Sequence, residues 1–190
     1  MIPDGTLSSV PVPSPFVFVP IREGLTDYEI GGVALQDASQ GLRVKVWTVT
    51  YDADSGDVRI SAPGVSATTL RNLPGLSYLS VAFDNNMNPA LSYQDGSGSH
   101  LWWYDTTIPG YATRDYPTAV TPYITLDDNS PLSISNDDIL LSYSRDGKLY
   151  YRQQRDRFTV EYWLADNVLT LTQVAMGKNN RLQFGVGRVA

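Results

Sequence analysis

The chain contains no cysteine, one histidine (His100) and only three glutamates among its 20 acidic residues. Without thiols it cannot form disulfides, thiolate metal sites or a cysteine nucleophile. A single histidine also excludes a metal site built from several imidazoles. We therefore expect no resident metal and no cofactor.

Long apolar runs are missing as well. No run approaches the roughly 20 residues that span a bilayer, and the N-terminus lacks the basic stretch and apolar core of a secretion signal. We expect a soluble chain made in the cytoplasm, with no membrane span. The formal net charge of -6 repels phosphate backbones, which disfavours nucleic acid as a partner.

No stretch has the 3.6-residue period of an amphipathic helix, and the composition favours strands instead. The chain has 12 Tyr, 4 Trp and 5 Phe, while 15 Gly and 12 Pro punctuate it as turn residues. Residues 42–51 and 57–62 alternate apolar and polar side chains on either side of a turn, which predicts a hairpin. Further strands are predicted at residues 76–83, 90–94, 100–105, 111–115, 123–126, 139–144, 148–153, 158–164, 169–175 and 181–186. The pattern predicts a single all-β domain over residues 28–190.

Residues 1–27 differ from the rest of the chain because prolines interrupt any helical or strand periodicity of the apolar residues. The prolines favour an extended course, and Phe16 and Phe18 make this arm too apolar for a solvated linker. Three interpretations stay open at this point. The arm packs on its own domain, reaches onto a neighbouring subunit, or is disordered.

An internal repeat is the strongest pattern. Residues 88–105 (NPALSYQDGSGSHLWWYD) align with residues 137–154 (DDILLSYSRDGKLYYRQQ). Both copies contain Leu-Ser-Tyr, then Asp-Gly, then leucine and two aromatic residues, and the repeat extends over residues 81–116 and 124–165. A period of 40 to 50 residues with about four strands is typical of β-propeller blades.

The ends of the chain resemble parts of a further unit. Residues 180–187 resemble an inner strand and residues 42–62 resemble the outer hairpin that would follow it, which predicts one sheet built from both ends. The chain is short for a propeller, so the prediction is a small propeller-like arrangement with an extended arm, and a twisted β-sandwich is the alternative.

Residues with catalytic chemistry are few. His100 follows a Gly- and Ser-rich loop without a partner at a fixed spacing, which favours a surface role. Asp127-Asp128 and Asp137-Asp138 are adjacent in turns, whereas acid/base hydrolysis needs two separated carboxyls in different environments. Turn capping is the preferred interpretation of these pairs, with calcium coordination as the alternative. We predict no catalytic residues and no enzyme.

Two clusters are candidates for interaction. Trp102 and Trp103 are consecutive, so on a strand their rings point to opposite faces, either covered on both sides or partly available to stack on a sugar or protein. Arg152, Arg155 and Arg157 surround a turn and could bind phosphate or an acidic surface. The acidity of the chain favours pairing within the protein or between subunits.

The hairpin SYSRDGKLYY also resembles the Asp-box turn of sialidase propellers. The spacing differs, because Gly147 directly follows Asp146, and three glutamates give no assured Tyr–Glu pair or arginine triad. The resemblance therefore implies turn architecture alone.

Most of the chain after the arm resembles a largely uncharacterised family of virion proteins from tailed bacteriophages and prophages, found among tail-module genes. YYRQQRDRF, at residues 150–158, is the most specific match. The matching segments are residues 30–47, 81–94, 124–128, 138–158 and 176–184. The resemblance implies a tail-associated structural protein that resides in the virion and contacts other virion proteins and copies of itself. A host-receptor module that binds surface glycans through Trp102, Trp103 or Tyr104 is the alternative.

Overall fold

The computed structural model describes residues 28–37, 43–62, 64–84, 88–126, 139–176 and 182–188, and these residues form antiparallel sheets. Sheet A contains β1 (Tyr28–Asp37), β2 (Arg43–Asp52), β3 (Asp57–Ala62) and β4 (Val65–Asn72). Sheet B contains β5 (Tyr78–Phe83), β6 (Pro89–Asp95), β7 (Gly98–Asp105) and β8 (Gly110–Tyr116). Sheet C contains β9 (Val120–Leu126), β10 (Ile139–Arg145), β11 (Lys148–Gln153) and β12 (Tyr162–Asp166). Sheet D contains β13 (Thr170–Met176) and β14 (Leu182–Gly187). The predicted all-β class is confirmed.

The duplicated sequences form equivalent hairpins. Leu-Ser-Tyr lies on the second strand of its sheet in both copies, on β6 and on β10, and the aromatic residues lie on the third strand. In the second hairpin Arg145 pairs with Lys148, which leaves Asp146 and Gly147 as a two-residue loop with φ angles of 51° and 72°. Asp-Gly suits such a loop because both positions need a positive φ.

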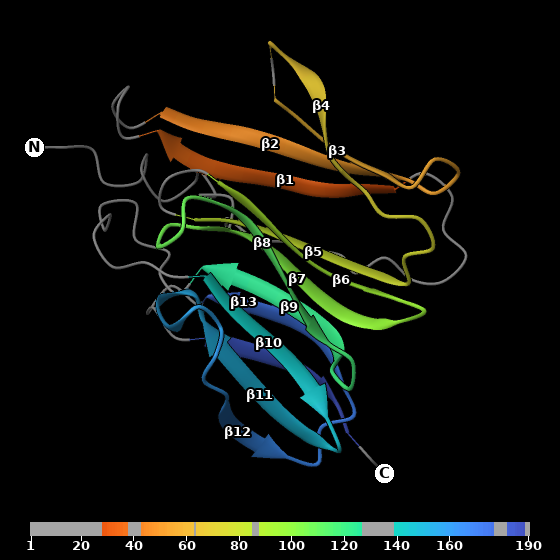
Figure 1. Cartoon of the computed structure of the whole chain (residues 1–190), viewed down its shortest axis with the longest axis vertical. Coiled ribbons are helices and arrows are strands. Elements are labelled where there is room, and N and C mark those ends of the chain that lie inside the picture. Colours follow the sequence, from red (N-terminus) through yellow and green to blue (C-terminus); the bar gives the residue numbers. More distant parts are fainter. Residues whose placement is uncertain are drawn as a thin grey trace, which may run out of the picture.

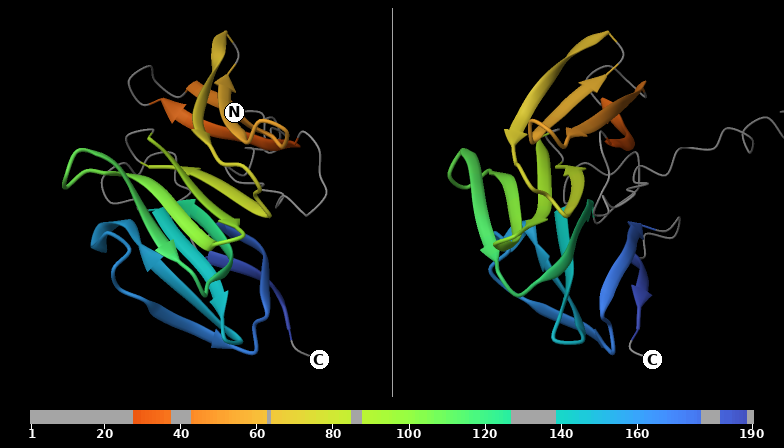
Figure 2. Two further views of the ribbon diagram at one scale, coloured as in Figure 1. Left: turned by 45° about the vertical axis from the view of Figure 1, so that its right-hand side comes forward. Right: turned by 90° about the vertical axis from the view of Figure 1, so that its right-hand side faces the viewer.

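Sheets B, C and D pack through the first strand of sheet C. β9 of sheet C contacts β5, β6 and β7 of sheet B and also β13 of sheet D. Sheets A, B and C follow one another from top to bottom in Figure 1, and the turned views in Figure 2 show sheet D beside sheet C. The described sheets do not close into a ring.

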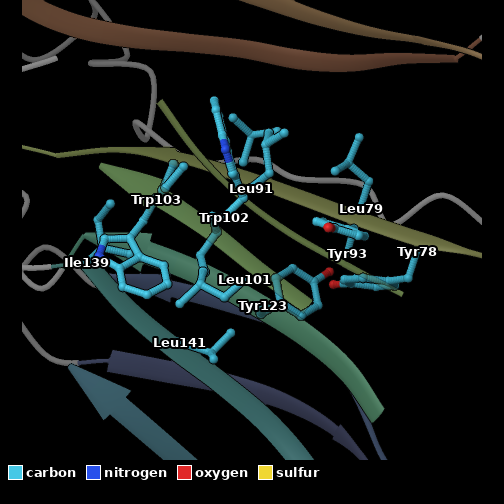
Figure 3. Packing of buried hydrophobic residues seen from close by; sticks show 14 of the residues in the cluster. Tyr78, Leu79, Leu91, Tyr93, Leu101, Trp102, Trp103, Tyr123, Ile139 and Leu141 are labelled. Carbon is cyan, nitrogen blue, oxygen red and sulfur yellow. The ribbon is translucent and has the colours of Figure 1, made fainter. Parts of the chain in front are cut away.

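One apolar core runs through these contacts. Leu79, Leu91, Leu101 and Leu141 are fully buried. Figure 3 shows Leu101 and Leu141 on the side of sheet B that faces Tyr123, and Leu79 and Leu91 on its other side, toward sheet A. Burial of such side chains contributes about 1.5–3 kcal/mol each relative to exposure.

Buried serine hydroxyls reinforce the packing between sheets B and C. Ser92 on β6 donates a short hydrogen bond to the carbonyl of Pro122 on β9. Ser80 on β5 accepts from the N–H of Ile124, also on β9, at 3.2 Å. These hydroxyls satisfy backbone groups of β9 that would otherwise be buried without partners.

Two sequence predictions need correction. The sheet built from both ends of the chain is wrong, because β2 and β3 pair within sheet A, while β14 pairs only with β13 among the described strands. The strand predicted at residues 158–164 begins later, at Tyr162, because residues 154–158 form the short 3-10 helix η2 (Gln154–Asp156) and a turn. The described residues include no helix with the length and hydropathy of a membrane span.

Candidate functional site

The segment YYRQQRDRF leaves β11, forms η2 and then reverses direction at two left-handed residues. Arg157 and Phe158 have φ angles of 56° and 57°. Their amides donate to the carbonyls of Gln154 and Gln153 at 2.7 and 2.8 Å. Left-handed backbone at a bulky residue costs free energy and persists only where the surroundings hold it.

Phe158 holds the turn against sheet B. Its side chain is fully buried and meets the ring of Trp103 edge-on at 5.2 Å. Its carbonyl accepts from Arg152 at 3.0 Å, from Arg114 at 3.3 Å and from the hydroxyl of Tyr116 at 3.4 Å. Trp103, Arg114 and Tyr116 belong to sheet B. The turn therefore joins sheet C to sheet B.

A charged network lies beneath this turn. Glu161 binds Arg145 at 2.7 Å and Arg152 at 3.1 Å, and it accepts a short hydrogen bond from the hydroxyl of Tyr143. Arg152 also donates to the Tyr143 hydroxyl at 2.8 Å and lies 5.1 Å above the ring of Tyr116. Burial alone would raise the pKa of Glu161, but the bonds from Tyr143 and Arg145 outweigh burial and hold that pKa below its usual value.

Tyr143 and Glu161 therefore form a Tyr–Glu pair, which the sequence does not reveal. The two residues lie on different elements, and no spacing rule connects them. Burial, followed by the hydrogen bond to Glu161, raises the pKa of Tyr143 to about 12. A nucleophilic phenol needs a lowered pKa and access to substrate, whereas Tyr143 is only 1% exposed. This arrangement fits a structural network that holds the turn.

The three predicted interaction arginines have different surroundings. Arg152 lies in the network, and Arg157 binds the buried carboxylate of Asp105 at 2.6 Å. Arg155 is exposed. Burial alone would raise the pKa of Asp105, but bonds from the amides of Thr107 and Ile108 and from Arg157 lower it overall.

Trp102 and Trp103 are both buried, at 6% and 3% exposure. Trp102 stacks on Tyr111 with ring centroids 3.9 Å apart, and Arg71 lies 5.5 Å from its ring. Trp103 packs on Phe158. The two rings thus lie on opposite faces of β7, and each is covered by a different aromatic residue. Tyr111, at 45% exposure, presents the outer ring of the stacked pair.

His100 has partners that the sequence did not predict. Its Nδ1 lies 2.7 Å from Asp115, its Nε2 lies 3.0 Å from the hydroxyl of Ser97 and 3.2 Å from Asp95, and its ring stacks on Tyr93. These distances resemble those of a Ser–His–Asp triad. However, the Ser97 hydroxyl donates to Asp95 at 2.7 Å, the shorter of its two contacts, so its proton points away from the imidazole. The cluster joins the β6–β7 turn to β8.

Aspartates at the described turns bond to the backbone. Asp52 accepts from the amides of Asp54 and Ser55, and Asp95 from that of Ser97. Hydrogen bonds from the amide and side chain of Ser55 lower the pKa of Asp52. Within the described ranges, no group of three or more His, Asp or Glu side chains is arranged to hold a metal ion. Phe16, Phe18 and the pairs Asp127-Asp128 and Asp137-Asp138 lie outside the described residues.

The outer strand of sheet C carries an exposed apolar surface. Tyr162, Trp163 and Leu164 on β12 are 37%, 60% and 39% exposed. The sequence predicted a strand here but gave no sign that it lies at the edge of a sheet. A scan against models of known protein families finds no match to the chain, and a search of curated proteins finds none either.

Proposed function

We propose that the chain is a structural component of a tailed-bacteriophage virion, associated with the tail and assembled in several copies through its arm and its β body. The resemblance of residues 138–158 to virion proteins supports this function. The observation that carries it is the apolar edge strand β12, whose Trp163 is 60% exposed. Exposed apolar surface of this kind is typical of contacts with other proteins.

We also propose that the sheets are arranged like the blades of a small propeller. The repeated meander of sheets B and C and the succession of contacts from β5 to β9 to β13 support this arrangement. A twisted β-sandwich is the alternative, in which sheets B and C are simply two packed layers.

The proposal assigns the chain a role in binding other proteins and not in catalysis. It is supported by the structural roles of the polar side chains. Glu161 binds two arginines and a tyrosine, Asp105 binds Arg157, and His100 bridges two aspartates. Each of these contacts fastens one strand or turn to another.

Purified particles test the proposal. Virions of a phage or induced prophage that encodes the chain are banded in a density gradient, and each fraction is probed with an antibody to the recombinant protein. The protein should peak with the infectious particles and stay with the tails after the heads are removed. Its absence from the particle band would end the proposal.

The alternative, a carbohydrate-binding module of the tail, is favoured by the exposed rings of Tyr111 and Trp163, since sugars stack on aromatic faces. A glycan array with the recombinant protein tests it. Trp163→Ala or Tyr111→Ala should remove binding while the protein stays folded. Unchanged glycan binding by both variants, or no binding by the wild type, would contradict this alternative.

A further inference from the structure

β12 is an edge strand of sheet C, with 5 residues and one bulge at Leu164 in its pairing with β11. It pairs with β11 on one side, and no described strand pairs with its other side. Edge strands commonly carry lysine or proline, or are covered by another element. β12 has the sequence YWLAD, with neither lysine nor proline. Among the described residues, its outer edge is therefore not paired with another strand and lies beside exposed apolar side chains.

The exposed side chains of β12 point to both faces of sheet C. Trp163 pairs with Tyr150 and Tyr162 pairs with Tyr151, so the two exposed rings lie on opposite faces. A sugar or a protein surface lying on one face could cover only one of them. A strand that runs along the edge can cover both, since its own side chains also alternate between the faces.

The arm contains a segment with matching properties. Residues 16–19 read FVFV, so they present apolar side chains to both faces when extended. Pro15 and Pro20 bracket them and have no N–H to donate, which limits a strand here to about four residues. β12 has 5 residues. We propose that residues 16–19 of a neighbouring copy add to the outer edge of β12 as an extra strand.

A neighbouring copy is the better source than the same chain. The arm precedes Tyr28, the first residue of β1, and all views in Figures 1 and 2 place sheet A and β12 at opposite ends of the molecule. Residues 20–27 reach about 30 Å at full extension and would have to pass sheets B and C. An arm that binds the next copy gives a head-to-tail contact, which forms rings or filaments of many copies. The inference thus rests on the proposed assembly function and names the surface that would be used.

Disulfide trapping can test the contact because the chain has no native cysteine. Full-length Phe18→Cys protein is mixed with full-length protein carrying one cysteine on β12, at Tyr162, Trp163 or Leu164, and the mixture is oxidised. Paired strands hold their Cα atoms about 4.5–5.5 Å apart, within the range of a disulfide. Ile108→Cys is the matched control, because Ile108 is 64% exposed and lies between β7 and β8.

A disulfide-linked dimer should form between Phe18→Cys and at least one β12 variant, and none with the Ile108 control. Light scattering supplies an independent measurement. Phe16→Ser together with Phe18→Ser should cause a loss of the assembled species without changing the urea midpoint of the folded body. The β12 substitutions are at exposed positions, and circular dichroism checks that each variant is folded.

Three results would overturn the inference. One is the absence of any link between position 18 and the β12 positions. Another concerns a double variant that carries Phe18→Cys and the β12 cysteine in one chain. If the link forms within this chain but not between two single variants, the arm binds β12 of its own chain. The last is a link between two β12 strands without the arm. None of these depends on virions, so a failure here and an absence from particles can be told apart.

Discussion

Replacing Phe158 with alanine tests whether the turn after β11 holds sheets B and C together. The side chain is fully buried and contacts Trp103, so its loss removes apolar burial and leaves a cavity between two sheets. Substitutions of this kind cost about 3–5 kcal/mol. Phenylalanine and alanine at position 158 would have the same left-handed backbone, at φ 57°, so the strain of the turn stays nearly unchanged. The cost should therefore reflect the lost packing.

Urea unfolding followed by tryptophan fluorescence measures this cost. With a slope of about 2–3 kcal/mol per molar urea, Phe158→Ala should lower the midpoint by about 1–2.5 M. Val160→Ala is the matched control because Val160 is 43% exposed, and its unfolding free energy should change by less than about 0.5 kcal/mol. A loss below about 1 kcal/mol for Phe158→Ala, similar to the control, would refute the joining role of this turn.

Three further predictions concern polar contacts and one glycine. Because the pKa of Tyr143 is raised to about 12, its stabilising contribution is present below pH 10 and is lost as pH rises toward 12. Tyr143→Phe should remove about 2 kcal/mol of the loss of unfolding free energy between pH 9 and pH 11.5, measured by urea unfolding at both pH values. The pKa of Asp105 is lowered, so its ion pair with Arg157 stabilises the fold above about pH 4, and this stabilisation is lost as pH falls. Arg157→Ala should lower the free energy of unfolding by about 1–3 kcal/mol at pH 7 and by less at pH 3. An equal loss at both pH values would argue against the ion pair. Gly98 has φ +131°, and a Cβ there would lie 2.8 Å from backbone, so Gly98→Ala should lower the midpoint of thermal unfolding measurably more than Gly96→Ala in the same turn, where nothing lies within 4 Å of the added Cβ.

Local patterns in the sequence were sufficient to locate most strands. β3 and β11 have the predicted bounds, because alternation of apolar side chains and turn residues both act over a few positions. β4 was not predicted, since VSATTLRN is exposed along most of its length and has no apolar face to give a period. The sheet joining both ends was wrong because pairing between distant strands depends on packing, which local patterns do not contain.

The candidate site was less predictable than the strands. The sequence identified Arg152 and Arg157 as a cluster, but their partners Glu161 and Asp105 come from different elements of the fold. Burial of Trp102 depends on the ring of Tyr111 stacking on it, and exposure of Trp163 depends on β12 being the last strand of sheet C. Residue type indicated which side chains could interact, while the fold determines which of them remain accessible.

Copy number in the virion tests the central claim most directly. Quantitative mass spectrometry of gradient-purified particles, calibrated against the major tail protein, gives the number of chains per tail. A structural component assembled through repeated contacts should be present in a fixed number of several copies per tail. A value well below one chain per tail, or a value that varies between preparations, would contradict the account.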